Sequence, residues 1–176
     1  MSTVLPLTIG MATVGAAADQ GGAGAERLAQ LLAADGHIIY SQIDLSLSQA
    51  SLAIDRDALD VQLGAWCNHP EIDTIMILGG IGLGARDVTT DAVSQRVTRE
   101  AVGFGESVRR LSSSVMPLGA LSLRAMAGVG PSTLLFALPD HLALIDLLYP
   151  ALIGPLCDAG QLGSLAALVP SLRAVG

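Results

Sequence analysis

Lysine is absent from the 176-residue sequence, and all nine basic side chains are arginine. This absence excludes a lysine nucleophile, a Schiff base and the lysine of a P-loop. Sixteen acidic residues give the chain a formal net charge of -7. The sequence also has no basic patch of useful density, which argues against a nucleic-acid partner.

Aromatic residues are scarce, at 3% of a chain that is 51% hydrophobic, so aliphatic side chains must form the core. The length suffices to bury such a core in a single domain, residues 1–176. The apolar runs are much shorter than the roughly 20 residues of a membrane span. The first residues lack the basic segment that opens a signal peptide. We therefore expect a soluble cytoplasmic protein with no membrane partner.

Cysteine is also rare. Cys67 and Cys157 are far apart, and neither has further metal ligands at a suitable spacing. Both are predicted to be small buried hydrophobic residues rather than halves of a disulfide. No tightly bound metal is expected.

Strand-like and helix-like spacings of apolar residues alternate along the chain. This alternation predicts an α/β protein with a mostly parallel central sheet that helices cover on both faces. The segment 46–54 is ambiguous, and 161–176 suggests a short last helix. Strands are predicted within 4–14, 37–45, 73–78 and 132–138, and helices within 25–36, 55–67, 89–102, 103–115 and 140–160, the last broken by proline.

A glycine-rich loop follows the predicted strand 73–78, in the sequence "IMILGGIGLGARDVTTDAV" (75–93). Glycines permit positive φ and let a ligand approach bare backbone, whose N–H groups can hold an anion. Arg86 can contact phosphate, and Asp87 can orient a hydroxyl or hold Mg²⁺ together with phosphate oxygens. The structural alternative is a tight turn in which Asp87 caps a helix that starts at Thr89 or Thr90.

Four ordered blocks, "GGIGLGARDVTTDAV", "REAVGFGESVRRLSSS", "RAMAGV" and "TLLFALP", resemble the MoaB/Mog family of molybdenum cofactor biosynthesis. The resemblance covers about residues 72–157. It implies a three-layer α/β/α sandwich that binds molybdopterin and forms a homotrimer or a dimer of trimers. It also implies an ancestral Mg-ATP-dependent adenylylation of molybdopterin, with ATP and Mg²⁺ as further ligands. The apolar segment 142–168 would then carry an oligomer-facing stripe.

The resemblance assigns site residues position by position. Asp87 is the candidate catalytic residue and the candidate Mg²⁺ ligand of this adenylyltransferase-like site. The other candidates are ligand-binding residues that fall on the family's blocks, namely Gly79, Gly80, Ile81, Gly82, Arg86, Glu100, Gly103, Glu106, Arg124 and Pro139.

Several family positions are altered in this chain. Ile81 replaces a threonine, Leu123 replaces a serine, and Asp140 and His141 replace the Gly-Ser that follows the proline. Asp140 puts a carboxylate where an anion would lie. Losing polar contacts to a charged ligand weakens binding, so the alternative function is a non-catalytic carrier or assembly partner.

Three assignments stay open at the level of the sequence. Asp19 is a candidate to replace the acid that the family has in its N-terminal loop, and Asp55 is a candidate for the acid that the family has after its second strand. Arg124 either binds an anion or pairs with Glu100 or Glu106. His141 is either a donor or general base in the ligand site, or a capping or exposed side chain.

Overall fold

The computed structural model describes residues 5–15, 22–45, 52–161 and 163–174, which form a six-stranded sheet. The strand order is β2-β1-β3-β6-β5-β4. Four strands run parallel, whereas β5 is antiparallel to β6 and β4 is antiparallel to β5. The strands are β1 Thr8–Val14, β2 Ile38–Leu45, β3 Thr74–Leu78, β4 Arg99–Glu100, β5 Met126–Val129 and β6 Leu134–Leu138.

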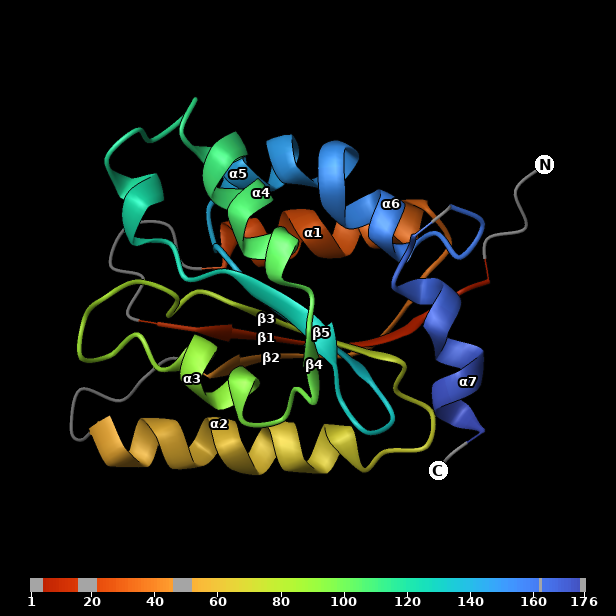
Figure 1. Cartoon of the computed structure of the whole chain (residues 1–176). Coiled ribbons are helices and arrows are strands. Elements are labelled where there is room, and N and C mark those ends of the chain that lie inside the picture. The colour runs from red at the N-terminus through yellow and green to blue at the C-terminus, as the bar shows by residue number, and fades with distance from the viewer. Residues whose placement is uncertain (1–4, 16–21, 46–51, 162, 175–176) are drawn as a thin grey trace.

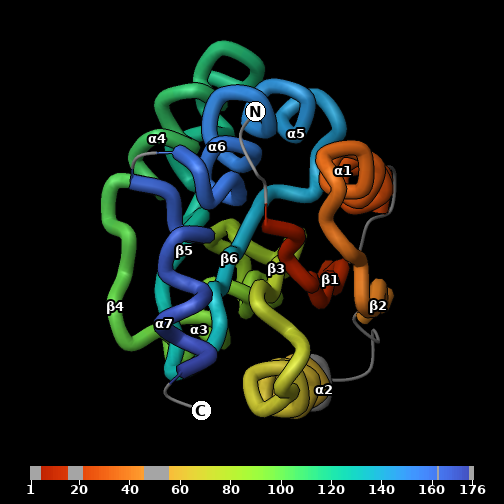
Figure 2. Tube along the Cα trace, turned by 90° about the vertical axis from the view of Figure 1, so that its right-hand side faces the viewer, coloured from red at the N-terminus to blue at the C-terminus, as the bar shows by residue number. Residues whose placement is uncertain are grey.

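Helices cover both faces of the sheet, which confirms the predicted three-layer α/β/α sandwich (Figure 1). Helices α1, α4, α5 and α6 lie on one face, and α2 and α3 lie on the other. Figure 2 shows α1 and α2 on opposite sides of the strands. The helices are α1 Ala23–Ala34, α2 Leu52–Cys67, α3 Thr89–Ser94, α4 Val102–Ser112, α5 Leu142–Leu148, α6 Gly154–Cys157 and α7 Val169–Arg173, with 3-10 turns at Gly119–Ser122 and Ala166–Leu168.

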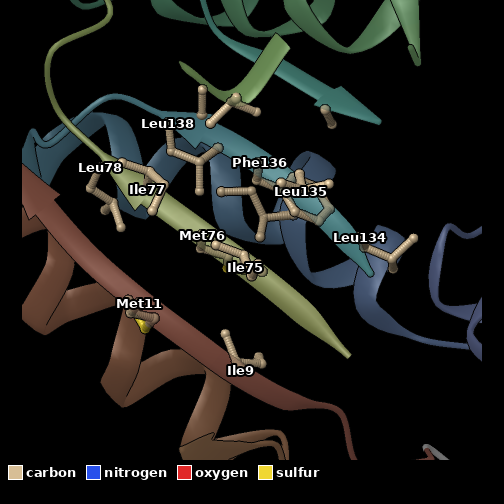
Figure 3. Packing of buried hydrophobic residues seen from close by; sticks show 14 of the residues in the cluster. Ile9, Met11, Ile75, Met76, Ile77, Leu78, Leu134, Leu135, Phe136 and Leu138 are labelled. Atoms are coloured by element: carbon tan, nitrogen blue, oxygen red, sulfur yellow. The ribbon is translucent and has the colours of Figure 1, made fainter. Parts of the chain in front are cut away.

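The central strands β3 and β6 are buried along their whole length. Their aliphatic side chains fill the space between the sheet and both helical layers (Figure 3). A strand covered on two faces reads as a continuous apolar run, which is why these two were recognisable in the sequence. The few aromatic rings include Phe104 and Phe136, which meet edge to face with centroids 5.6 Å apart.

The predicted helix over 89–102 is wrong beyond Ser94. Backbone N–H groups of Thr98 and Ala101 donate instead to carbonyls of β5, so this segment becomes the edge strand β4. Strand β5 could not be recognised in the sequence, because its alanine and glycine residues have little strand propensity. Gly128 is required there, since a Cβ would lie 2.7 Å from the carbonyl oxygen of Arg99.

The proline break predicted within 140–160 is confirmed as a π-helical turn, Tyr149–Ile153, between α5 and α6. Pro150 lacks an N–H and cannot continue the α-helical ladder. Most apolar residues of this region face the core, while Leu142 and Leu168 are 44% and 40% exposed. The oligomer expected from the family resemblance stays a prediction.

Both cysteines are free thiols. Cys157 is buried, as predicted, and its burial raises the pKa of the thiol to about 12. Cys67 is only partly buried, and desolvation raises the pKa of its thiol as well. No helix among the described residues is both long enough and apolar enough to cross a membrane.

Asp73, the residue before β3, connects the C-terminal helix α7 to the first residues of β1 and β6. Its side chain is 2% exposed, and Oδ2 accepts the N–H of Thr8 at 2.9 Å. Its backbone carbonyl accepts the N–H of Leu134 at 2.9 Å. Arg173 on α7 donates from Nε to Oδ1 at 2.7 Å and from Nη2 to Oδ2 at 2.8 Å. The buried carboxylate therefore joins β1 to α7, and the backbone carbonyl of the same residue joins β6.

We expect the substitution Arg173→Met to lower the free energy of unfolding by about 1–3 kcal/mol, because it leaves a buried carboxylate unpaired. Arg27→Met is the matched control, because Arg27 pairs with Asp146 at 2.6 Å with side chains 39% and 47% exposed. The control should cost less than about 1 kcal/mol. Urea unfolding measures both, and equal losses would contradict the assigned role of Asp73.

Candidate functional site

The carboxyl ends of β1, β3 and β6 lie side by side, since these parallel strands are neighbours in the sheet. The glycine-rich loop after β3 leaves the sheet at this end, at the left of Figure 1. Ligands of open α/β sheets bind outside the carboxyl ends of strands. We therefore expect the site residues predicted from the sequence to meet at this end of the sheet.

Gly79 and Gly80 form the first turn of the loop with φ of 85° and 63°. A Cβ on Gly79 would lie 2.1 Å from the carbonyl oxygen of Val14, and one on Gly80 would lie 2.6 Å from Oγ1 of Thr89. The N–H of Gly79 donates to the carbonyl of Leu138 at 2.9 Å. Both glycines are thus required by the backbone itself, which supports the tight-turn interpretation of these two positions.

The second half of the loop is wrapped around the carboxylate of Asp87. Oδ2 accepts the N–H of Gly84 at 2.7 Å, and a Cβ on Gly82 would lie 2.7 Å from the same oxygen. The alternative in which Asp87 caps the next helix is wrong, because Val88 is the N-cap residue and no side-chain bond caps α3. The carboxylate shapes the loop through Oδ2, and Oδ1 is its second acceptor atom.

Arg124 connects this loop to α3. Its backbone N–H donates to the carbonyl of Ile81 at 2.7 Å, and its own carbonyl accepts the hydroxyl of Thr90 at 2.7 Å. Its guanidinium donates to both oxygens of Asp91, at 3.2 and 2.5 Å. The hydrogen bonds from Arg124 lower the pKa of Asp91, and they raise the pKa of Arg124.

The remaining candidates from the "REAVGFGE" block lie elsewhere on the sheet. Glu100 on β4 and Glu106 on α4 are exposed, and two strands separate β4 from β3. The predicted pairing of either glutamate with Arg124 is wrong, because the Arg124 guanidinium forms an ion pair with Asp91. Sequence reasoning missed Asp91 because its partner lies 33 residues away.

Three of the other predicted residues lie in different surroundings. Nothing lies within 4 Å of a Cβ built on Gly103, so this glycine has open space around it. Pro139 is buried at the end of β6, next to the loop. Arg86 is partly buried beside Asp87 and has an interaction of its own within the protein.

Asp140 occupies the N-terminus of α1. Oδ2 accepts the N–H of Gly22 and Oδ1 accepts the N–H of Ala25, both at 3.0 Å. A Cβ on Gly24 would lie 2.6 Å from Oδ1, so this glycine permits the close approach. The unpaired N–H groups and dipole of a helix start favour an anion at this point. The protein supplies that anion from its own chain.

His141 follows at the N-cap position of α5, where its side chain makes no capping bond. Its Nδ1 is buried and lacks a hydrogen-bond partner within the described part of the chain. The predicted capping role is therefore wrong. Asp19 lies outside the described residues, and the side chain of Asp55 on α2 lies outside them too, so neither candidate acid can be placed.

A divalent cation at this end of the sheet would have to be held largely by the phosphates of a bound substrate and by water. No group of three His, Cys, Asp or Glu side chains that could hold a metal occurs within the described ranges. Mg²⁺ is commonly bound through one or two carboxylates, water and substrate phosphates. Asp87, with Oδ2 held by the loop, fits the protein's share of such a site.

We expect Gly79→Ala to lower the free energy of unfolding by at least about 3 kcal/mol, because a Cβ meets the Val14 carbonyl at a left-handed φ. Gly103→Ala is the matched control, because it adds the same methyl in open space near the start of α4. The control should be neutral or stabilise by up to about 1 kcal/mol. Chemical unfolding measures the free energy of unfolding of both variants. A Gly79→Ala variant as stable as the original protein would contradict the turn geometry.

A sequence model of the family described as "Probable molybdopterin binding domain" matches residues 25–145. "Molybdenum cofactor biosynthesis protein B" of Staphylococcus aureus is 36% identical over 137 residues, which cover 75% of this chain and 76% of the relative. Its Staphylococcus epidermidis namesake is 42% identical over 103 residues, 57% of this chain and only 58% of that relative's length.

A crystal structure titled for molybdenum cofactor biosynthesis protein B shares the fold with a TM-score of 0.78 and 22% identity. The match covers 98% of this chain and 99% of that one. The Thermus thermophilus MoaB structure also shares the fold, with a TM-score of 0.69 and 96% of each chain covered, at 22% identity. The chain therefore belongs to the MoaB/Mog family of molybdenum cofactor biosynthesis proteins.

Proposed function

We propose that this protein binds molybdopterin at the carboxyl ends of β1, β3 and β6. The observation that carries the proposal is the loop at 79–87, whose glycines keep the backbone free of side chains around the Asp87 carboxylate. The loop lies inside the segment that the molybdopterin-binding family covers. Its place at the carboxyl ends of strands is where such folds bind ligands.

The chemistry of the loop suits a small ligand with hydrogen-bonding edges and a negative group. Gly82 has no side chain, so its backbone lies directly against the Asp87 carboxylate, and a ligand that reaches this carboxylate would also meet backbone N–H groups of the loop. Arg124 adds positive charge at the same place, though Asp91 already neutralises much of it. The affinity should thus come chiefly from the backbone and from the shape of the loop.

Retention of the ancestral adenylyl transfer is the finer part of this proposal. ATP would bring phosphate oxygens that complete a Mg²⁺ site at Asp87. Mg²⁺, when bound, neutralises charge that develops on the phosphates. The protein's own part is to hold the Asp87 carboxylate still, which the N–H of Gly84 does.

Calorimetric titration with molybdopterin tests the binding directly. We expect a Kd below about 100 μM, which corresponds to roughly -5.5 kcal/mol. Asp87→Ala should weaken binding about tenfold or more, because the loop loses the acceptor for Gly84. Asp87→Asn is the matched control, because its amide oxygen keeps that hydrogen bond, and it should bind within about threefold of the original protein. An absence of binding at this concentration would refute the proposal.

A second function, that of a non-catalytic carrier or assembly partner, is favoured by one observation. Asp140 fills the N-terminus of α1 with a carboxylate, at 3.0 Å from two backbone nitrogens. A phosphate approaching that helix start would find two of its donors, the N–H groups of Gly22 and Ala25, in use and would face a like charge. A family member altered in this way can keep the pterin and lose the nucleotide.

Pyrophosphate release from Mg-ATP in the presence of molybdopterin separates the two functions. Turnover that Asp87→Asn abolishes would exclude the non-catalytic function, because the carboxylate charge would then be required. If Asp140 blocks nucleotide binding, we expect Asp140→Ser to raise turnover by about tenfold or more, since it removes a like charge at close range. Asp146→Ser is the control at an exposed position on α5, and it should change nothing.

A further inference from the structure

A cavity of about 800 Å³ opens at the opposite end of the sheet from the glycine-rich loop. Thr8 and Ile38, the first residues of β1 and β2, line it together with the turn before β3 and part of α7. The seven residues of β1 separate this cavity from the loop by roughly 20 Å, at about 3.3 Å per residue. It is therefore physically distinct from the proposed pterin site.

One wall of the cavity is apolar and open to solvent. Ile38 and Tyr40 are 54% and 45% exposed, and they project from the same side of the edge strand β2 because they are two residues apart. Ile72, Pro70 and Leu172 add further apolar lining. Exposed apolar groups that gather around a hollow are typical of a ligand site.

The hydroxyl of Tyr40 provides a hydrogen-bond donor at this wall of the cavity. Its hydroxyl lies 2.9 Å from Nε2 of His69, and the two rings are 4.6 Å apart between centroids. Nδ1 of His69 accepts the N–H of Glu71 at 3.3 Å, which leaves the ring proton on Nε2. Nε2–H therefore donates to the phenol oxygen, and the phenol proton is directed away from His69 toward another acceptor.

Arg173 supplies positive charge to the same cavity. It binds Asp73 through Nε and Nη2, so that carboxylate does not use Nη1. A guanidinium has five N–H donors, so the N–H groups of Nη1 can donate to the carboxylate of a ligand. Glu71 is the one acidic side chain among the lining residues, and its side chain is exposed.

We propose that this cavity is a second ligand site, for a small planar aromatic molecule that carries a carboxylate. The ring lies against Ile38 and Tyr40, and the carboxylate accepts hydrogen bonds from the Tyr40 hydroxyl and from Nη1 of Arg173. The volume is in the range of about 300–1,000 Å³ that small-molecule sites occupy. The proposal does not depend on the proposed pterin function, because the two sites share no residue.

Titration with benzoate, followed by the amide resonances of the ¹⁵N-labelled protein, tests this site. We expect saturable shifts at residues 38–40, 67–73 and 172–173 below about 10 mM, the affinity range of a single-ring fragment. Benzamide lacks the charge and cyclohexanecarboxylate lacks the aromatic ring, so each should bind at least about threefold more weakly. Benzoate that shifts none of these resonances, or that binds no better than both analogues, overturns the proposal.

The two tyrosines of the chain give a matched pair of variants. Tyr40→Phe removes only the hydroxyl at a half-exposed position, and it should weaken benzoate binding about tenfold. Tyr149→Phe removes the hydroxyl that donates to Asp35 at 2.7 Å, away from this cavity, and should leave the affinity unchanged. Equal affinities of Tyr40→Phe and the original protein would contradict the assigned donor.

Discussion

The close approach of two backbones at the end of β1 and β3 is the constraint on which the site depends. Because the carbonyl of Val14 stands where a side chain of residue 79 would lie, the chain must turn there through glycine. That turn directs residues 80–87 away from the sheet and around Asp87. Arg124 then fixes the loop to α3 through its own backbone. The glycines are thus required first by the fold, and the proposed ligand site follows from the turn that they make.

Most charged groups within the site are paired or hydrogen-bonded to other groups of the protein itself. Asp91 pairs with Arg124, Gly84 donates to Asp87, and Asp140 takes the N–H groups at the start of α1. A site whose donors are already used favours ligands held by backbone shape over ligands held by strong charge. This supports pterin binding more than nucleotide binding, and it gives a physical reason for separating the two functions.

Much of the fold could be predicted from the sequence, because central strands such as β3 are continuous apolar runs bounded by glycine and proline. The family and the glycine loop were also predictable, since four ordered blocks carry them. The short strands β4 and β5 could not be predicted, because the alanine and glycine of β5 have little strand propensity. The need for Gly128 becomes clear only from its close contact with the carbonyl oxygen of Arg99. Contacts between distant residues were equally hidden: nothing in the spacing pairs Arg124 with Asp91 or Asp140 with Ala25.

A crystal structure of the protein with molybdopterin bound is the decisive measurement, because it shows where the pterin lies. We expect the pterin to contact the backbone of residues 79–84 beside Asp87, while Asp140 keeps its hydrogen bonds to Gly22 and Ala25. A pterin that displaces Asp140 and places its own negative group at the N-terminus of α1 would contradict the conclusion that the Asp140 carboxylate occupies this helix start. A pterin bound only at the amino ends of the strands would contradict the location of the site itself.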